Sequence, residues 1–159
     1  MSRLDSFIRR LVAQREILDM ICLEMPLRDG VVIELGLGNG RTYDHLRDRL
    51  GDRRIIAFDR VLAAHKGSTP EPADLVLGEI DVTARAFFGI GAAFVHADIG
   101  SGYDDLDRVN LAWLPDVTLQ LLGPSGITAS GVRMDHPGLE PLPLPPSVAE
   151  GRYYIYRKR

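Results

Sequence analysis

The first 25 residues carry apolar side chains at intervals of three and four positions, with charged residues of both signs between them. This spacing predicts an amphipathic helix over residues 2–25, whose apolar stripe packs on the rest of the protein. Ser2 and Asp5 have the spacing of a capping box that starts the helix, and Pro26 and Gly30 end it. The apolar positions are Leu4, Ile8, Leu11, Leu18, Ile21 and Met25.

From residue 31 the pattern changes to short apolar runs that alternate with amphipathic segments. The runs have the length of buried strands, and the amphipathic segments have the length of helices. This alternation predicts an α/β fold, a mostly parallel sheet with helices on both faces. We expect strands over residues 31–35, 55–58, 75–77 with 79–80, 92–97 and 127–132, and helices over 41–50 and 104–122.

The C-terminal part differs in composition. Five of the ten prolines lie within residues 137–146, and proline cannot donate to a sheet, so we expect an extended loop there. Residues 153–156 are typical of a last strand, antiparallel or at an edge. Residues 1–159 are therefore expected to form one domain. Its parts would be a helix over 1–25, a core over 31–132 and a proline-rich tail with the last strand over 133–159.

The chain of 159 residues has a net charge of −3, distributed unevenly. Residues 61–150 carry 4 basic and 12 acidic side chains, an excess that repels phosphate backbones, so we expect no nucleic-acid partner. One cysteine, Cys22, excludes an intrachain disulfide and fits a reducing compartment. The longest apolar run, residues 86–95, is far shorter than the ~20 residues of a membrane helix. We therefore expect a cytoplasmic protein without a membrane partner.

A glycine-rich turn at residues 34–40, Glu-Leu-Gly-Leu-Gly-Asn-Gly, follows a predicted strand and opens a predicted helix. Its glycines let the backbone turn tightly and approach a ligand at the carboxyl end of the strand. A dinucleotide fingerprint would have glycine or alanine where Arg41 stands, and Glu34 would repel a pyrophosphate but attract an ammonium or sulfonium group. Asp59, at the end of the next strand, suits both hydroxyls of a ribose. The pattern favours a nucleoside ligand that carries positive charge.

This turn, followed by an acid after the second strand, resembles the first two motifs of class I S-adenosylmethionine (SAM)-dependent methyltransferases. Residues 78–80 (Gly-Glu-Ile), 94–98 (Phe-Val-His-Ala-Asp) and 121–127 (Leu-Leu-Gly-Pro-Ser-Gly-Ile) resemble later motifs of that family in the same order. Within that family the chain resembles a small, uncharacterised bacterial group that consists of little beyond the core. The resemblance implies SAM as cofactor, S-adenosylhomocysteine (SAH) as product, and a Rossmann-like sheet with a shortened C-terminal part and a last antiparallel strand.

The resemblance also assigns roles around the cofactor. The glycines make room for the methionine part and the ribose, and Asp59 binds the ribose. Glu79 accepts a hydrogen bond from the adenine amino group or a ribose hydroxyl, and Arg60 either stacks on the adenine or lies as a surface charge. Metal-dependent relatives carry an Asp-Asn pair that this sequence lacks, so we expect no catalytic metal. The predicted cofactor-binding residues are Glu34, Gly36, Leu37, Gly38, Asn39, Gly40, Thr42, Tyr43, Asp59, Arg60, Gly78, Glu79, Ile80 and Asp98.

Asp98 and His96, at the end of the fourth predicted strand, are the candidate catalytic residues. A histidine with an ordinary pKa of ~6.5 suits a general base, and a buried structural role for His96 is the alternative. The resemblance implies methyl transfer to a small-molecule acceptor by in-line displacement at the sulfonium methyl. Two alternatives remain, a non-catalytic SAM-binding sensor or partner module and a nicotinamide-dependent oxidoreductase. So short a chain has few segments with which to close its pocket, so we also expect a homo-oligomer.

Overall fold

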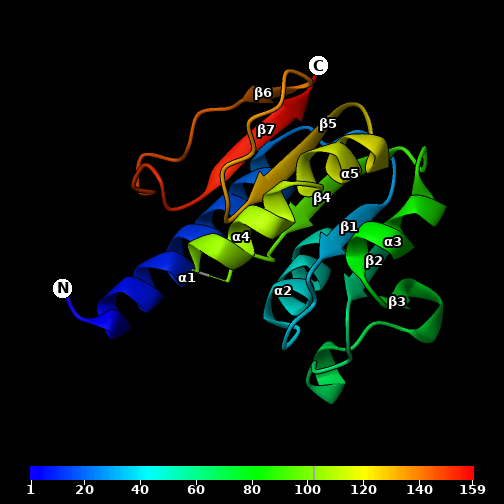
Figure 1. Ribbon diagram of the computed structural model, residues 1–159, viewed down its shortest axis with the longest axis horizontal. Coiled ribbons are helices and arrows are strands. Elements are labelled where there is room, and N and C mark those ends of the chain that lie inside the picture. Colours follow the sequence, from blue (N-terminus) through cyan, green and yellow to red (C-terminus); the bar gives the residue numbers. More distant parts are fainter. Residues whose placement is uncertain (102) are drawn as a thin grey trace.

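The computed structural model describes residues 1–101 and 103–159, which form a seven-stranded sheet in the order β3-β2-β1-β4-β5-β7-β6 (Figure 1). Strands β1 to β5 are parallel, whereas β7 is antiparallel to both of its neighbours, β5 and β6. This confirms the predicted α/β fold with a last antiparallel strand. The strands are β1 (Val32–Leu35), β2 (Ile55–Asp59), β3 (Leu75–Leu77), β4 (Ala92–Ala97), β5 (Leu122–Ser130), β6 (Leu139–Pro141) and β7 (Tyr154–Lys158).

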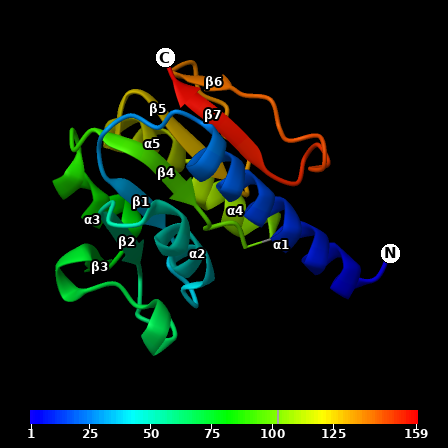
Figure 2. The same ribbon diagram turned by 180° about the vertical axis from the view of Figure 1, so that it is seen from behind.

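Helices cover both faces of this sheet (Figures 1 and 2). On one face lie α1 (Arg3–Asp19) and α2 (Arg41–Leu50), and on the other lie α3 (Ile80–Thr83), α4 (Asp104–Leu111) and α5 (Leu114–Leu121). Because successive strand residues face opposite layers, Val32 packs with α1 and α2 while Ile33 packs with α5. Shorter helical turns cover residues Met20–Glu24 (a π-helical turn), Lys66–Ser68, Pro72–Asp74 and Ala84–Phe87.

The first helix begins as its sequence predicts. The Ser2 hydroxyl accepts a hydrogen bond from the Asp5 amide at 3.0 Å, and the Ser2 amide donates to the Asp5 carboxylate at 2.9 Å. This capping box satisfies amide groups that have no partner within the helix. Regular α-helix ends at Asp19, and the π-helical turn carries the chain on to Glu24, so the expected helical segment is present in two geometries.

Three predicted boundaries are wrong. The single helix expected over residues 104–122 is two helices, because Pro115 has no amide proton and takes a place in the first turn of α5. Residues 79–80 do not extend the third strand, since Glu79 precedes the first residue of α3. The fifth strand also begins earlier than expected, at Leu122, and passes through a bulge in which Ser125 has φ 59°.

The proline-rich segment contains a strand that the sequence did not predict. Residues Leu139–Pro141 form β6 at the edge of the sheet. The amides of Leu142 and Arg159 take part in hydrogen bonds between β6 and β7. In the antiparallel alternation Pro141 therefore occupies a position whose nitrogen faces away from β7. An edge strand tolerates proline at such a position, which explains why the expectation of an extended loop is wrong for residues 139–141.

The topology brings the carboxyl ends of β1, β2 and β4 to one edge. Glu34 on β1 is the register partner of His96 on β4, and Leu35 is the partner of Phe58 on β2. The order of neighbouring strands reverses at β1, and ligands bind at such points in open α/β sheets. None of the described helices is long and apolar enough to cross a membrane.

Candidate functional site

The glycine-rich turn after β1 brings bare backbone to the edge of the sheet. Gly36 has φ 92°, and a Cβ atom there would lie 2.7 Å from the carbonyl oxygen of Asp98. The amides of Gly36 and Leu37 donate to the carbonyl oxygen of Phe58 at 2.9 and 3.1 Å, which fixes the turn against β2. At Gly38 the space that a side chain would occupy is open. The turn is rigid and leaves room for a ligand against its backbone.

Asp59, the last residue of β2, supports this turn from the neighbouring strand. Its Oδ2 accepts a hydrogen bond from the Gly38 amide at 2.7 Å, and its Oδ1 accepts one from the Arg60 amide at 2.6 Å. A carboxylate has about four acceptor positions, so each oxygen retains capacity for a ligand hydroxyl. Beside it, Nε of Arg60 lies 3.1 Å from Oε1 of Glu79.

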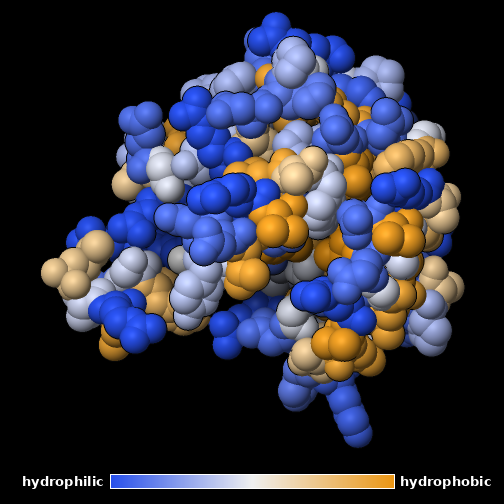
Figure 3. Space-filling view, viewed as in Figure 1, coloured by the Kyte–Doolittle hydropathy of each residue, from blue (hydrophilic) through white to orange (hydrophobic). Residues whose placement is uncertain are grey.

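A cavity of about 710 Å³ lies at the carboxyl ends of β1, β2 and β4. Its volume falls within the ~300–1,000 Å³ of small-molecule sites. On the far side from these strands it is lined by Leu106, Val109 and Trp113, and Figure 3 shows hydrophobic side chains gathered over α4. A recess of about 150 Å³ adjoins the cavity next to α1 and shares Gly36, Gly38 and Asp98 with it. The two spaces form one site of two unequal compartments.

Most of the predicted cofactor-binding residues line this site. The cavity contains Gly36, Gly38, Asp59, Arg60, Glu79, Ile80 and Asp98, and the recess adds Leu37, Asn39 and Thr42. Among the described residues, five candidates line neither compartment: Glu34, Gly40, Tyr43, Gly78 and His96. Gly40 and Gly78 have φ values of 85° and 137°, so they shape the backbone, and Tyr43 is buried in the core.

The recess also contains side chains that the sequence analysis did not predict. Arg10, Leu11 and Gln14 reach it from α1. Nη1 of Arg10 lies 3.7 Å from Oδ1 of Asp98, and these side chains are 43% and 25% exposed. A positive and a negative group therefore stand next to each other at the recess. One feature of the sequence points to this face of the helix, since Gln14 is a polar residue close to the predicted apolar stripe.

A chain of buried polar side chains lies directly beneath the recess. Glu34 and His96 have no exposed surface, and Nδ1 of His96 lies 2.7 Å from Oε2 of Glu34. The hydroxyl of Thr42 donates to Oε1 of Glu34, and Nε2 of His96 is hydrogen-bonded to the hydroxyl of Tyr153. Gln14 donates to the same hydroxyl at 3.2 Å. The chain therefore connects α1, α2, β1, β4 and the start of β7 through the core.

This burial changes the interpretation of both strand-end candidates. Both oxygens of Glu34 are engaged by the protein, so the expected attraction of its carboxylate to a cationic ligand is not a direct contact in this arrangement. Asp98, two residues beyond His96, is an acid that lines both compartments. Both ring nitrogens of His96 have partners inside the protein, and the choice between its catalytic and structural roles stays a prediction.

The pKa values of the buried Glu34, His96 and Tyr153 side chains are shifted by burial and by the charge of the neighbouring group. Burial raises the pKa of Glu34, and His96 and Thr42 offset only part of this effect. Burial alone would lower the pKa of His96, but the Glu34 carboxylate outweighs it, so the pKa of His96 is raised. Burial also raises the pKa of Tyr153 well above its ordinary value. The folded protein therefore keeps a proton within the Glu34–His96 pair to a higher pH than the separate groups would.

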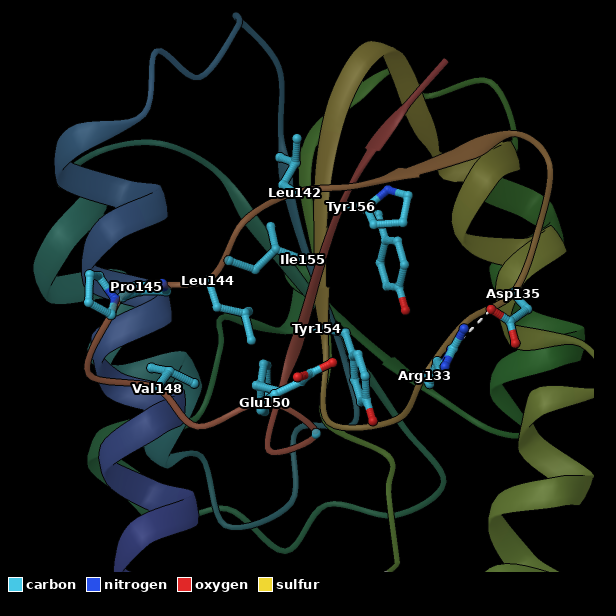
Figure 4. A pocket seen from close by; sticks show the side chains of 14 residues that line it. Arg133, Asp135, Leu142, Leu144, Pro145, Val148, Glu150, Tyr154, Ile155 and Tyr156 are labelled. Carbon is cyan, nitrogen blue, oxygen red and sulfur yellow. Dashed lines mark hydrogen bonds and ion pairs between the residues drawn. The ribbon is translucent and has the colours of Figure 1, made fainter.

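A second cavity, of about 530 Å³, lies beside β7 and away from the strand ends (Figure 4). Leu142 and Leu144 lie on one side of it, and Tyr154 and the ion pair of Arg133 with Asp135 lie on the other, with a distance of 3.1 Å between the paired atoms. In the described part of the chain this cavity shares no lining residue with the two-compartment site.

The described residues contain no group of three or more His, Cys, Asp or Glu side chains arranged to hold a metal ion. The absence of a catalytic metal stays a prediction.

Residues 1–158 match a protein family described as S-adenosyl-L-methionine methyltransferase. The chain belongs to this family. A similar solved structure is that of an S-adenosyl-L-methionine methyl transferase from Silicibacter pomeroyi DSS-3, with 42% identity, 99% of each chain covered and a TM-score of 0.90. The family membership and this relative confirm the predicted enzyme class and the predicted SAM cofactor.

More distant structures share the fold of this methyltransferase. The antibiotic-resistance methyltransferase Kmr is 14% identical, with 91% of this chain and 92% of that chain covered and a TM-score of 0.59. TrmN from Thermus thermophilus is 17% identical, with 94% of this chain and 49% of that chain covered and a TM-score of 0.64. No curated protein matches the sequence. These comparisons do not identify the methyl acceptor, and they do not support the expectation that nucleic acid is excluded.

Proposed function

We propose that this methyltransferase transfers the methyl group of SAM to a small-molecule acceptor at the edge formed by β1, β2 and β4. One observation carries the proposal, the convergence of the glycine-rich turn, Asp59 and Asp98 on a site of two unequal compartments. SAM has the corresponding two parts, a large adenosine and a small amino-acid end. In this proposal the cavity of about 710 Å³ holds adenosine and the recess of about 150 Å³ holds the amino-acid end.

The charges at the recess support this orientation. The amino-acid end carries one ammonium and one carboxylate group, and Asp98 and Arg10 provide one charge of each sign 3.7 Å apart. Asp98 would bind the ammonium group and Arg10 the carboxylate. Asp59 would accept hydrogen bonds from the ribose hydroxyls, and Gly38 would leave room for the ligand against its open backbone. In the reverse orientation the carboxylate of SAM would lie next to Asp98. Two negative charges would then be close together, which costs electrostatic energy.

Asp98 is the residue that we propose for the chemistry. SAM supplies a methyl group on a positively charged sulfur, which an acceptor atom displaces in line, so positioning provides much of the rate. Asp98 lines both compartments, where its carboxylate can orient the acceptor or accept a proton from it. We propose His96 as a positioning residue that holds the strand end through Glu34, because its nitrogens are already bonded.

Two observations favour a small acceptor and a further copy of the chain. The excess of acidic side chains in residues 61–150 disfavours a polyanion. Leu106 and Val109 line the cavity yet are 57% and 65% exposed, and a second copy would cover them. We propose a homo-oligomer on this basis. Light scattering that gives the mass of one chain in a fully active preparation would contradict it.

The proposed function is tested by following a labelled methyl group. The purified protein is incubated with methyl-labelled SAM and, separately, with a bacterial extract of small molecules and with RNA and DNA from the same cells. We expect label to appear in the small-molecule fraction and an Asp98→Asn variant to transfer less. Label only in nucleic acid would contradict the proposed acceptor class. SAM binding without transfer to any fraction would favour the alternative of a non-catalytic SAM-binding module.

A further inference from the structure

A hollow of about 680 Å³ lies against the N-terminal half of α1, outside the two-compartment site. Figure 2 shows this part of the helix extending beyond the sheet. Residues at intervals of three and four along a helix share one face. Such a face of α1 supplies most of the lining of the hollow, and the segment before β7 supplies Arg152. The lining residues are Arg3, Leu4, Ser6, Phe7, Arg10 and Arg152.

The hollow combines apolar side chains with positively charged side chains. Leu4 and Phe7 are 65% and 43% exposed although they belong to the face that lines it. Three of the six lining residues are arginines, and the described lining includes no acidic side chain. The guanidinium of Arg152 donates a hydrogen bond to a neutral group, the Ser6 hydroxyl, at 3.3 Å, and within the described residues no ion pair of Arg152 is found. Such a surface is complementary to an anion that has an apolar body.

Arg10 connects the hollow with the site of the cofactor. It lines both the hollow and the recess, its guanidinium carbon lies 5.6 Å from the centre of the Phe7 ring, and its Nη1 reaches Asp98. The hollow and the recess therefore share the Arg10 side chain. The second cavity, beside β7, differs in that its Arg133 is paired with Asp135 and Glu150 adds a negative charge, so it selects no charge class.

We infer that the hollow binds the methyl acceptor, and that the acceptor carries a carboxylate or phosphate group next to an apolar body. The inference rests on the proposed function. Arg3 and Arg152 would hold the anionic group, Leu4 and Phe7 would contact the apolar body, and Arg10 would face both the acceptor and the cofactor.

The test uses three probes with the same naphthalene ring and different polar groups, on the full chain saturated with SAH. The probes are 2-naphthoate, 2-naphthyl phosphate and the neutral 2-naphthamide, and their Kd values are measured by calorimetric titration. We expect one or both anions to bind at least about tenfold more tightly than the amide, because each ion pair with a guanidinium adds to binding. Comparison of the carboxylate with the phosphate identifies the group that the hollow prefers.

A pair of double variants locates the binding. Arg3→Gln/Arg152→Gln removes two charges from the hollow, whereas Arg9→Gln/Arg15→Gln removes two exposed charges from the same helix outside it. We expect about a tenfold loss of anion affinity in the first and little change in the second, with SAH binding retained in both. A Phe7→Ala variant should weaken all three probes, since it removes apolar contact area.

Each further outcome has a defined meaning. Equal binding of the amide and the anions, or equal loss in both double variants, would overturn the inference. If SAH binds but no probe binds its complex, the inference also fails while the proposed function stands. If SAH itself does not bind, the proposed function fails first, which the same titration shows before any probe is added.

Discussion

Replacing His96 with leucine tests the buried polar chain beneath the recess. The change leaves the Glu34 carboxylate without the partner 2.7 Å away, in a place with no exposed surface. Breaking a buried ion pair on one side costs about 3–5 kcal/mol, because the remaining charge is neither solvated nor paired. With a change of ~2–4 °C per kcal/mol for a domain of this size, the melting temperature should fall by roughly 6–20 °C.

His45 provides a matched control. Its Nε2 lies 2.8 Å from Oδ1 of Asp19, but both side chains are partly exposed, so loss of the contact should cost at most about 1 kcal/mol. Thermal and urea unfolding of His96→Leu and His45→Leu measure the difference. If His96→Leu loses as little stability as His45→Leu, the pair does not stabilise the fold as argued.

The same pair sets a pH dependence. Because the pKa values of Glu34 and His96 are both raised, the folded state keeps a proton that the unfolded chain releases above pH ~6.5, and stability should fall as pH rises from there. The slope is at most about 1.4 kcal/mol per pH unit. Urea unfolding from pH 6 to 9 should show it in the natural sequence and in His45→Leu but not in Glu34→Gln/His96→Leu. An unchanged slope in that double variant would show that the Glu34–His96 pair does not cause the pH dependence.

Three further predictions concern single positions. Asp59→Ala should weaken SAH binding by about 1.5–3 kcal/mol in calorimetry, since it removes a charged acceptor, and unchanged affinity in a folded variant would contradict its role. Gly36→Ala should lower the free energy of unfolding more than Gly38→Ala, because only at Gly36 does a Cβ meet the carbonyl oxygen of Asp98, and equal losses in urea unfolding would contradict this. Burial raises the pKa of Cys22 to about 11, so at pH 8 its thiol should react with a disulfide reagent more than about tenfold slower than in the unfolded chain, and equal rates would argue against the burial.

The elements that the sequence predicted well are those with local causes. The glycine-rich turn and Asp59 lie in contiguous motifs, and backbone conformation at Gly36 depends on few neighbours, so their place at the strand ends could be expected. The edge strand of residues 139–141 could not be expected from the sequence, because its pairing depends on which side of Pro141 faces β7. That orientation is a property of the register between distant segments.

The parts of the site that the sequence missed depend on contacts across the fold. Glu34 and His96 meet because β1 and β4 are neighbours in a register that aligns these residues, and no local pattern specifies that register. Tyr153, the residue before β7, completes the buried polar chain from 57 positions beyond His96, and Arg10 reaches Asp98 from the first helix. From the sequence we expected the carboxylate of Glu34 to attract a cationic ligand. In the fold its two oxygens are hydrogen-bonded to Thr42 and His96.

The most direct measurement of the central claim is thermal unfolding of the purified protein with SAM, SAH, NADH or no ligand. A ligand at 100 times its Kd stabilises the folded state by ~2.7 kcal/mol, which corresponds to a shift of roughly 5–11 °C for a domain of this size. We predict this shift with SAM and SAH and none with NADH. A shift with NADH alone would contradict the assignment of the two-compartment site to SAM. The absence of a shift with any of the three ligands would contradict it as well.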